Sequence, residues 1–149
     1  MYSDGYSILG EKIVVEGLPK RPAERERDML RLLGQQLLSG IFIKGGADAF
    51  LRPGGRVRTV AESGLSNPRT AVELNGAAMV VGGTMLALDI APKLAAAMLV
   101  GSLAPTTIVG HAFWREDNEA VRKTQLTQFL KNLGLMGGLL LVLLVEKDE

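Results

Sequence analysis

The stretch LAAAMLVGSLAPTTIVGHAFW, Leu94–Trp114, runs for 21 residues without a formal charge when His111 is neutral. That length is sufficient to cross a bilayer as an α-helix, because about 20 apolar residues span the hydrocarbon core. A second apolar stretch, FLKNLGLMGGLLLVLLV at Phe129–Val145, follows after a short charged segment. Two such stretches so close together are rare in a soluble domain. The sequence therefore predicts an integral membrane protein.

The composition fits one domain in which polar segments accompany apolar helices. The chain has 149 residues, of which 47% are hydrophobic, a net charge of +1, one histidine and no cysteine. A charge this close to neutral, without a basic stripe, argues against nucleic acid as a partner. The lack of cysteine removes disulfides and thiolate chemistry from this chain. With one histidine and no cysteine, we expect no metal site.

The hydropathy pattern predicts an all-α fold, a four-transmembrane-helix bundle with a polar N-terminal tail. We expect the tail at residues 1–28, cytoplasmic or lying at the membrane surface, and the transmembrane domain at residues 29–149. A helix start, an interfacial segment or a disordered tail would each suit the charged block 20–28. The predicted spans are about 29–51, 72–91, 92–114 and 126–145. A soluble four-helix protein is the competing interpretation.

The first span is the least apolar of the four. It holds Arg31, Lys44 and Asp48, and such residues are costly in lipid. We therefore expect it to insert with its polar face turned inward against the other helices. The segment Arg52–Ala71, rich in Pro, Gly and Arg, predicts a loop with one helical turn.

Small residues predict where the helices pack closely, because backbones approach best where side chains are short. These positions are Gly82-Gly83, the pair Ala97 and Gly101, and the pair Gly134 and Gly138.

Polar residues near the ends of the spans form the candidate site. If the spans alternate in direction, these residues gather at one level of the membrane: Lys44, Asp48, Glu73, Asn75, His111, Trp114, Lys131 and Asn132. Lys44 and Asp48, four residues apart, are expected to pair. His111 is the group suited to moving a proton near neutral pH, and Lys131 can neutralise an anion, so these two are the catalytic candidates. A structural polar network, a ligand or proton-coupled site, and a docking surface remain as alternatives.

The pattern His111-Ala112-Phe113-Trp114, followed by Phe129–Asn132 and glycines at 134, 137 and 138, resembles the DoxX family of small bacterial membrane proteins. The stretch Ile41–Pro53 is similar to the end of the first helix of that family. The resemblance covers residues 29–145 and leaves the first 28 unmatched. It implies a four-helix protein of the bacterial inner membrane that works with redox proteins. Some relatives are subunits of quinone-linked sulfur-oxidising complexes, and others belong to assemblies that handle thiol or oxidative stress.

The charges alone hardly distinguish the two sides of the membrane. With both termini inside, eight Lys and Arg residues lie on that side and nine on the other, so the positive-inside rule gives little direction. The resemblance, together with the basic cluster before the first span, favours both termini in the cytoplasm.

The leading hypothesis is a membrane subunit or anchor of a redox assembly, either thiol and oxidative-stress or quinone-linked sulfur, without catalysis of its own. It would hold partner proteins through Arg115–Gln125, Arg52–Ala71 and the tail. The alternative is a subunit of a quinone-linked oxidoreductase that binds quinone or a small sulfur species at a proton-coupled polar site. A third hypothesis is a small oligomeric transporter. The expected partners are the lipid bilayer and either a redox protein or further copies of this chain.

Overall fold

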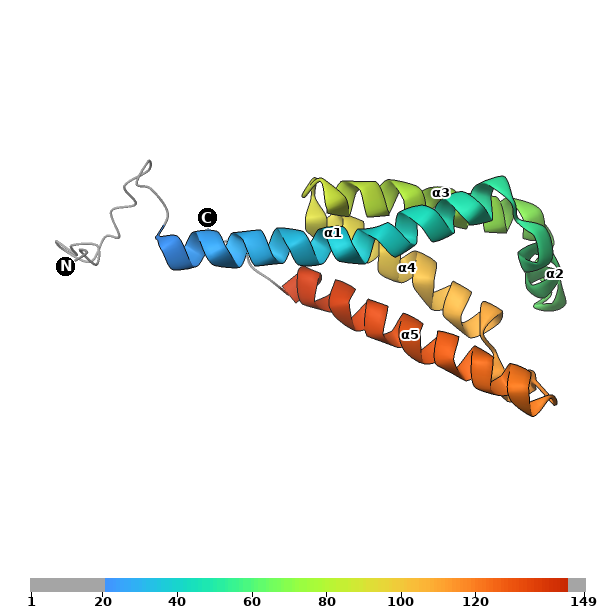
Figure 1. Ribbon diagram of the computed structural model, residues 1–149. Helices are drawn as coiled ribbons and strands as arrows, with labels where there is room; N and C mark the ends of the chain where they lie inside the picture. The colour runs from blue at the N-terminus through green and yellow to red at the C-terminus, as the bar shows by residue number, and fades with distance from the viewer. Residues whose placement is uncertain (1–20, 145–149) are drawn as a thin grey trace, which may run out of the picture. The chain divides into compact units, whose positions relative to one another are not determined.

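The computed structural model describes residues 21–144, and this part of the chain contains helices and turns but no β-strand. The chain divides into two units, Met1–Leu30 and Arg31–Glu149. The elements are α1 Pro22–Leu51, α2 Gly54–Glu62, α3 Pro68–Ala87, α4 Pro92–Gly110, the short 3-10 turn η1 Phe113–Arg115 and α5 Glu119–Leu144 (Figure 1). The predicted all-α fold is confirmed.

The described residues of the first unit form the start of α1. Pro22 suits a first helical position because its missing N–H has no acceptor there. One carboxylate oxygen of Glu24 accepts the backbone N–H of Arg21 at 3.0 Å, and the other accepts Arg21 Nε at 2.7 Å. These bonds to Arg21 hold the pKa of Glu24 below its usual value. Of the alternatives given for 20–28, the structure shows a helix, which begins at Pro22 and so ahead of the predicted 29, while residues 1–20 of the predicted tail lie outside the described residues.

Three helical stretches within residues 21–144 are long and apolar enough to cross a membrane. They are Pro68–Ala87, Pro92–Arg115 and Glu119–Leu144, which correspond to the second, third and fourth predicted spans. α1 is long enough but does not reach the same apolarity. The chain is thus a multi-pass membrane protein with three candidate spans.

The bounds of the third and fifth helices differ from the predicted spans. α3 begins at Pro68, ahead of the predicted 72, and ends at Ala87, short of the predicted 91. It ends there because Asp89 and Ala91 take positive φ values of 55° and 42°, which no right-handed helix accommodates. α5 begins at Glu119, well before the predicted 126.

The early start of α5 has a local cause. Asn118 Oδ1 accepts the backbone N–H groups of Ala120 and Val121 at 3.0 and 3.2 Å. These bonds satisfy two of the N–H groups that a helix start leaves without partners.

The connection between α1 and α3 contains a nine-residue helix, so the expectation of a single helical turn is wrong. Pro53 at its start is buried, and Val57 and Val60 are half-buried. The helix contacts α3 and α4, and Figure 1 shows it turned across the end of α3. Packing on these neighbours stabilises a helix that its glycine-rich start would not favour alone.

α1 and α3 approach each other at glycines. A Cβ built on Gly46 would lie 2.6 Å from the carbonyl oxygen of Gly76, and one built on Gly76 would lie 2.7 Å from that of Gly46. Further along, a Cβ on Gly83 would lie 2.9 Å from Cγ1 of Ile43. The two backbones are therefore in direct contact over this stretch.

The predicted small-residue contacts are partly confirmed. Gly82 packs against α4, Gly83 packs against α1, and Gly138 lies in contact with a leucine of α1. The predictions for Gly101 and Gly134 are wrong, because a Cβ on either would meet no heavy atom within 4 Å. Spacing along a helix marks small residues but does not tell which of them face a neighbour.

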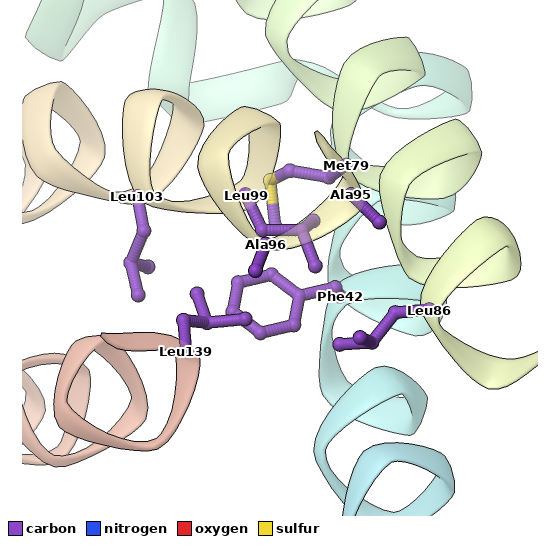
Figure 2. Packing of buried hydrophobic residues seen from close by; sticks show 8 residues of the cluster. All are labelled: Phe42, Met79, Leu86, Ala95, Ala96, Leu99, Leu103 and Leu139. Carbon is purple, nitrogen blue, oxygen red and sulfur yellow. The ribbon is translucent and has the colours of Figure 1, made fainter. Parts of the chain in front are cut away.

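Four long helices contribute to one buried apolar core. Figure 2 shows the ring of Phe42, from α1, at its centre, between Leu139 of α5 and Leu86 of α3. Phe42 is 1% exposed, and both leucines are completely buried. The other members of the core are Met79, Ala95, Ala96, Leu99 and Leu103. α1 is thus integral to the packing although it is the least apolar of the long helices.

The polar side chains of α1 divide between the core and the surface. Gln35 is 3% exposed, as expected for a polar residue of this helix that faces inward, and Ser39 is 1% exposed, whereas Gln36 is exposed. The same expectation is wrong for Lys44, whose side chain is 80% exposed. Lys44 stays at the surface because a buried lysine would need a charged partner.

Candidate functional site

His111 stands where α4 ends and the 3-10 turn begins. Its backbone N–H still bonds to the carbonyl of Thr107, but its φ of −127° takes the chain out of the helix. Its side chain reaches α5, where Nδ1 lies 2.8 Å from Oε1 of Gln125. Because an amide oxygen only accepts, His111 donates from Nδ1, and its Nε2 is the acceptor when the ring is neutral.

Beside His111, three aromatic rings pack edge to face. The ring centroids of Phe113 and Trp114 are 5.1 Å apart, those of Phe113 and Phe129 5.4 Å, and those of Trp114 and Phe129 5.9 Å. Phe129 belongs to α5, so this aromatic trio joins the end of α4 to α5. Trp114 remains 52% exposed, which suits a side chain at the water interface of a membrane.

Lys131 and Asn132 are consecutive on α5 and have opposite surroundings. The side chain of Lys131 is exposed and donates to Gln128 of the same helix. Asn132 is 4% exposed, and its Nδ2 donates to Oγ1 of Thr107 at 3.1 Å. That hydroxyl donates in turn to the carbonyl of Leu103 at 2.6 Å. Asn132 is therefore a buried link between α5 and α4.

Asn75 makes a similar link from the opposite side of α4. Its Nδ2 donates to Oγ1 of Thr106 at 3.0 Å, and the Thr106 hydroxyl donates to the carbonyl of Ser102 at 2.8 Å. Adjacent threonines on α4 thus accept one asparagine from α3 and one from α5. The prediction included both asparagines but not the threonines. The available signal was a Thr-Thr pair within an otherwise apolar span.

The carboxylates among the candidates pair within their own helices. Lys44 Nζ lies 2.9 Å from Oδ2 of Asp48, so the expected pair is confirmed. Glu73 is paired with Arg69, one turn away, at 2.8 Å. Within the described part of the chain, Lys44 and Asp48 are the one pair of predicted site residues joined directly by a hydrogen bond.

At the other end of the helices, Arg31 and Asp89 form a contact that sequence reasoning did not include. Arg31 Nη1 donates to Oδ1 of Asp89 at 3.0 Å, and Nη2 donates to Oδ2 at 3.4 Å. Each side chain is about a quarter exposed, at 24% and 23%. The guanidinium thereby ties α1 to the turn between α3 and α4. In the sequence, the only indication of this contact was that Arg31 and Asp89 carry opposite charges near the ends of neighbouring predicted helices.

Three pairs therefore connect the candidate residues across helices: His111 with Gln125, Asn132 with Thr107, and Asn75 with Thr106. Chemically, these amides and hydroxyls hold helices together. Among residues 21–144, no group of three His, Asp or Glu side chains is arranged to hold a metal ion.

Comparison with known proteins gives one match. A family model described as DoxX matches residues 30–112, from the first turns of α1 to just beyond His111. The matched segment is more than half of the chain and ends before the Phe129–Asn132 motif on α5. No curated protein and no solved structure shows significant similarity to the chain.

Proposed function

Because this chain belongs to the DoxX family of membrane proteins, we propose that it is a membrane subunit that anchors a redox assembly. In this role it holds partner proteins at the membrane and carries out no catalysis of its own. The apolar helices supply the contact with the bilayer, and the partners dock on the connections between helices.

The observation that carries this proposal is the way three polar side chains between the helices are used. Asn132 and Asn75 each donate to a threonine of α4, and His111 donates to Gln125. A ligand site needs donors that remain available to the ligand, whereas Nδ2 of each asparagine and Nδ1 of His111 are bonded to side chains of neighbouring helices. Their arrangement supports a role in holding the helices in place.

The connection between α4 and α5 supports docking. Arg115, Asp117 and Arg122 are exposed, and Glu116 is half-buried. With respect to the residues that the structure describes, none of these four makes an ion pair within 4.0 Å. Unpaired charges of both signs suit a complementary partner surface, which they would orient during association.

We further propose that α1 crosses the membrane as a fourth span, in the bacterial inner membrane and with both termini in the cytoplasm. The support is the place of Phe42 in the shared core and the neutralisation of Arg31 by Asp89. Because the chain has no cysteine, Glu26→Cys and Ser63→Cys would each give a single reactive thiol. In intact cells, an impermeant thiol reagent should label the second and spare the first. Labelling of both from one side would contradict the fourth crossing.

The function is tested by recovering the protein from its own membranes in mild detergent and identifying its partners by native mass spectrometry. We expect a stoichiometric redox protein. The double variant Arg115→Gln/Arg122→Gln should lose that partner while its melting temperature stays unchanged. Arg58→Gln, at another exposed arginine, serves as the control and should keep the partner.

His111→Ala separates anchoring from catalysis. For an anchor, this variant lowers the melting temperature by breaking the bond to Gln125, while the folded fraction still binds the partner. Recovery of the wild-type protein alone with bound quinone, and loss of that quinone in His111→Ala, would overturn the anchor and favour the quinone site. Solute flux through liposomes that contain this protein alone would favour a transporter.

A further inference from the structure

The connection between α1 and α3 carries a concentration of positive charge. Residues 52–69 contain four arginines and one acidic residue, a net charge of +3. The arginines are Arg52, Arg56, Arg58 and Arg69, and all four are exposed. Arg56 and Arg58 lie within the short helix α2, Arg52 precedes it, and Arg69 is in the first turn of the candidate span α3.

These arginines fall into two pairs that differ in neutralisation. Arg58 lies 3.8 Å from a carboxylate oxygen of Glu62, and Arg69 lies 2.8 Å from one of Glu73. Arg52 and Arg56 make no ion pair within 4.0 Å to any carboxylate of residues 21–144.

The side chain of Arg56 lies against the backbone of Arg52. Arg56 Nη1 is 3.4 Å from the backbone carbonyl oxygen of Arg52, which brings its guanidinium beside the start of α2. The Asp48 carboxylate on the preceding turn is bonded to Lys44 Nζ at 2.9 Å. Arg52 and Arg56 also attract this carboxylate, so one negative charge faces three positive ones, and the cluster keeps a net charge of +2 that an external anion can neutralise.

The position of α2 indicates which anion is within reach. The helix α2 contacts α3 and α4, and its residues Val57 and Val60 are half-buried. It therefore lies near the start of the candidate span α3. The flanking apolar residues Leu51 and Leu65 are 72% and 52% exposed. Exposed leucines beside exposed arginines at the end of a span match the boundary between acyl chains and lipid headgroups.

We propose that Arg52 and Arg56 bind the phosphate of an anionic phospholipid, with Leu51 and Leu65 among its acyl chains. The guanidinium fork matches phosphate oxygens, and each basic residue near an anionic lipid surface strengthens binding. This inference is independent of the proposed anchor function. It assigns a lipid partner to part of the Arg52–Ala71 connection, for which the sequence had suggested a protein partner.

The test is a lipid titration of the full chain, delipidated in detergent, followed by native mass spectrometry. The probes are phosphatidylglycerol and phosphatidylcholine with identical acyl chains. The wild-type protein should bind phosphatidylglycerol more tightly. Arg52→Gln/Arg56→Gln should weaken that binding roughly 30-fold, since each arginine near an anionic surface contributes about fivefold. Binding of phosphatidylcholine should be unchanged.

Arg58→Gln/Arg69→Gln is the matched control, because it removes the same charge from the same connection. It should weaken phosphatidylglycerol binding by less than about threefold, since those arginines are already paired. Arg52→Lys/Arg56→Lys keeps the charge but loses the fork, and its affinity should fall between those of the wild type and the glutamine variant. Thermal unfolding identifies any variant that fails to fold, in which case the lysine variant replaces the glutamine variant.

Three results would overturn the inference. The first is equal affinity of the wild type for the two lipids. The second is that both glutamine double variants weaken phosphatidylglycerol binding equally. That result would indicate that the lipid is attracted by the overall positive charge of the connection and not by a site at Arg52 and Arg56. The third is a folded Arg52→Gln/Arg56→Gln protein that keeps its affinity for phosphatidylglycerol but loses a co-purifying protein.

Discussion

Gly46 of α1 and Gly76 of α3 face each other so closely that a Cβ on either would lie 2.6–2.7 Å from the carbonyl oxygen of the other. Real Cβ atoms essentially never come that near to an oxygen. Two helices can meet at this distance only where neither carries a side chain. The contact is reciprocal, so each glycine makes room for the backbone of the other.

Gly46→Ala should therefore separate α1 from α3. We expect a loss of about 1–3 kcal/mol in the free energy of unfolding, the usual cost of overpacking. The measurement is thermal or SDS-induced unfolding of the purified protein in detergent. Gly134→Ala is the matched control on α5 and should be neutral or slightly stabilising, because nothing lies within 4 Å of its Cβ. If Gly134→Ala lost as much unfolding free energy as Gly46→Ala, Gly134 would also lie in a close helix contact, contrary to the open space found there.

Arg31 and Asp89 should be energetically coupled. Their two-point contact lies at the end of the helices, with each side chain about a quarter exposed. In a double-mutant cycle of Arg31→Gln and Asp89→Asn, we expect a coupling of about 1 kcal/mol. Asparagine is the appropriate replacement because it tolerates the φ of 55° at this position. Additive single losses would show that the contact contributes no stability.

Asn132 and Thr107 should be coupled across the interface between α5 and α4. Interhelical hydrogen bonds in membranes contribute about 0.6 kcal/mol on average and up to about 1.7 kcal/mol. Because this one is fully buried, we expect Thr107→Val to reach the upper part of that range. Thr107→Ser keeps the hydroxyl and should retain most of the stability. A Thr107→Val variant as stable as the wild type would show that the hydrogen bond contributes no net stability, because valine keeps the methyl group and loses only the hydroxyl.

The environment of Trp114 should depend on Phe129. Trp114 is the single tryptophan of the chain, so its fluorescence reports on one place. Phe129→Leu removes two of the three edge-to-face contacts, each of about 0.5–1.5 kcal/mol. The emission of Trp114 should shift to the red as the ring becomes more hydrated. In vesicles, lipids brominated near the headgroup should quench Trp114 more than lipids brominated at the chain ends. Stronger quenching from the chain ends would contradict an interfacial position.

How far each contact of the candidate site could be predicted depends on how many residues separate its two partners along the sequence. The Lys44–Asp48 pair follows from helical spacing alone, because residues four apart share a helix face. The link between Asn132 and Thr107 joins residues 25 apart, and that between Arg31 and Asp89 joins residues 58 apart. Such partners depend on the rotation of each helix about its axis, which a local pattern does not specify.

By itself, the sequence determined that this is a helical membrane protein, because the length and apolarity of Leu94–Trp114 and Phe129–Val145 leave few other environments for them. It also placed the ends of the four long helices to within about two turns, since prolines and capping residues act locally, but it missed the nine-residue helix α2. Only the tertiary structure decided which faces meet. It brought Phe42 of the polar helix α1 into the common core and Gly46 against Gly76, while leaving Gly134 open. The physical reason is that packing depends on the simultaneous fit of several helices, and no single segment contains that information.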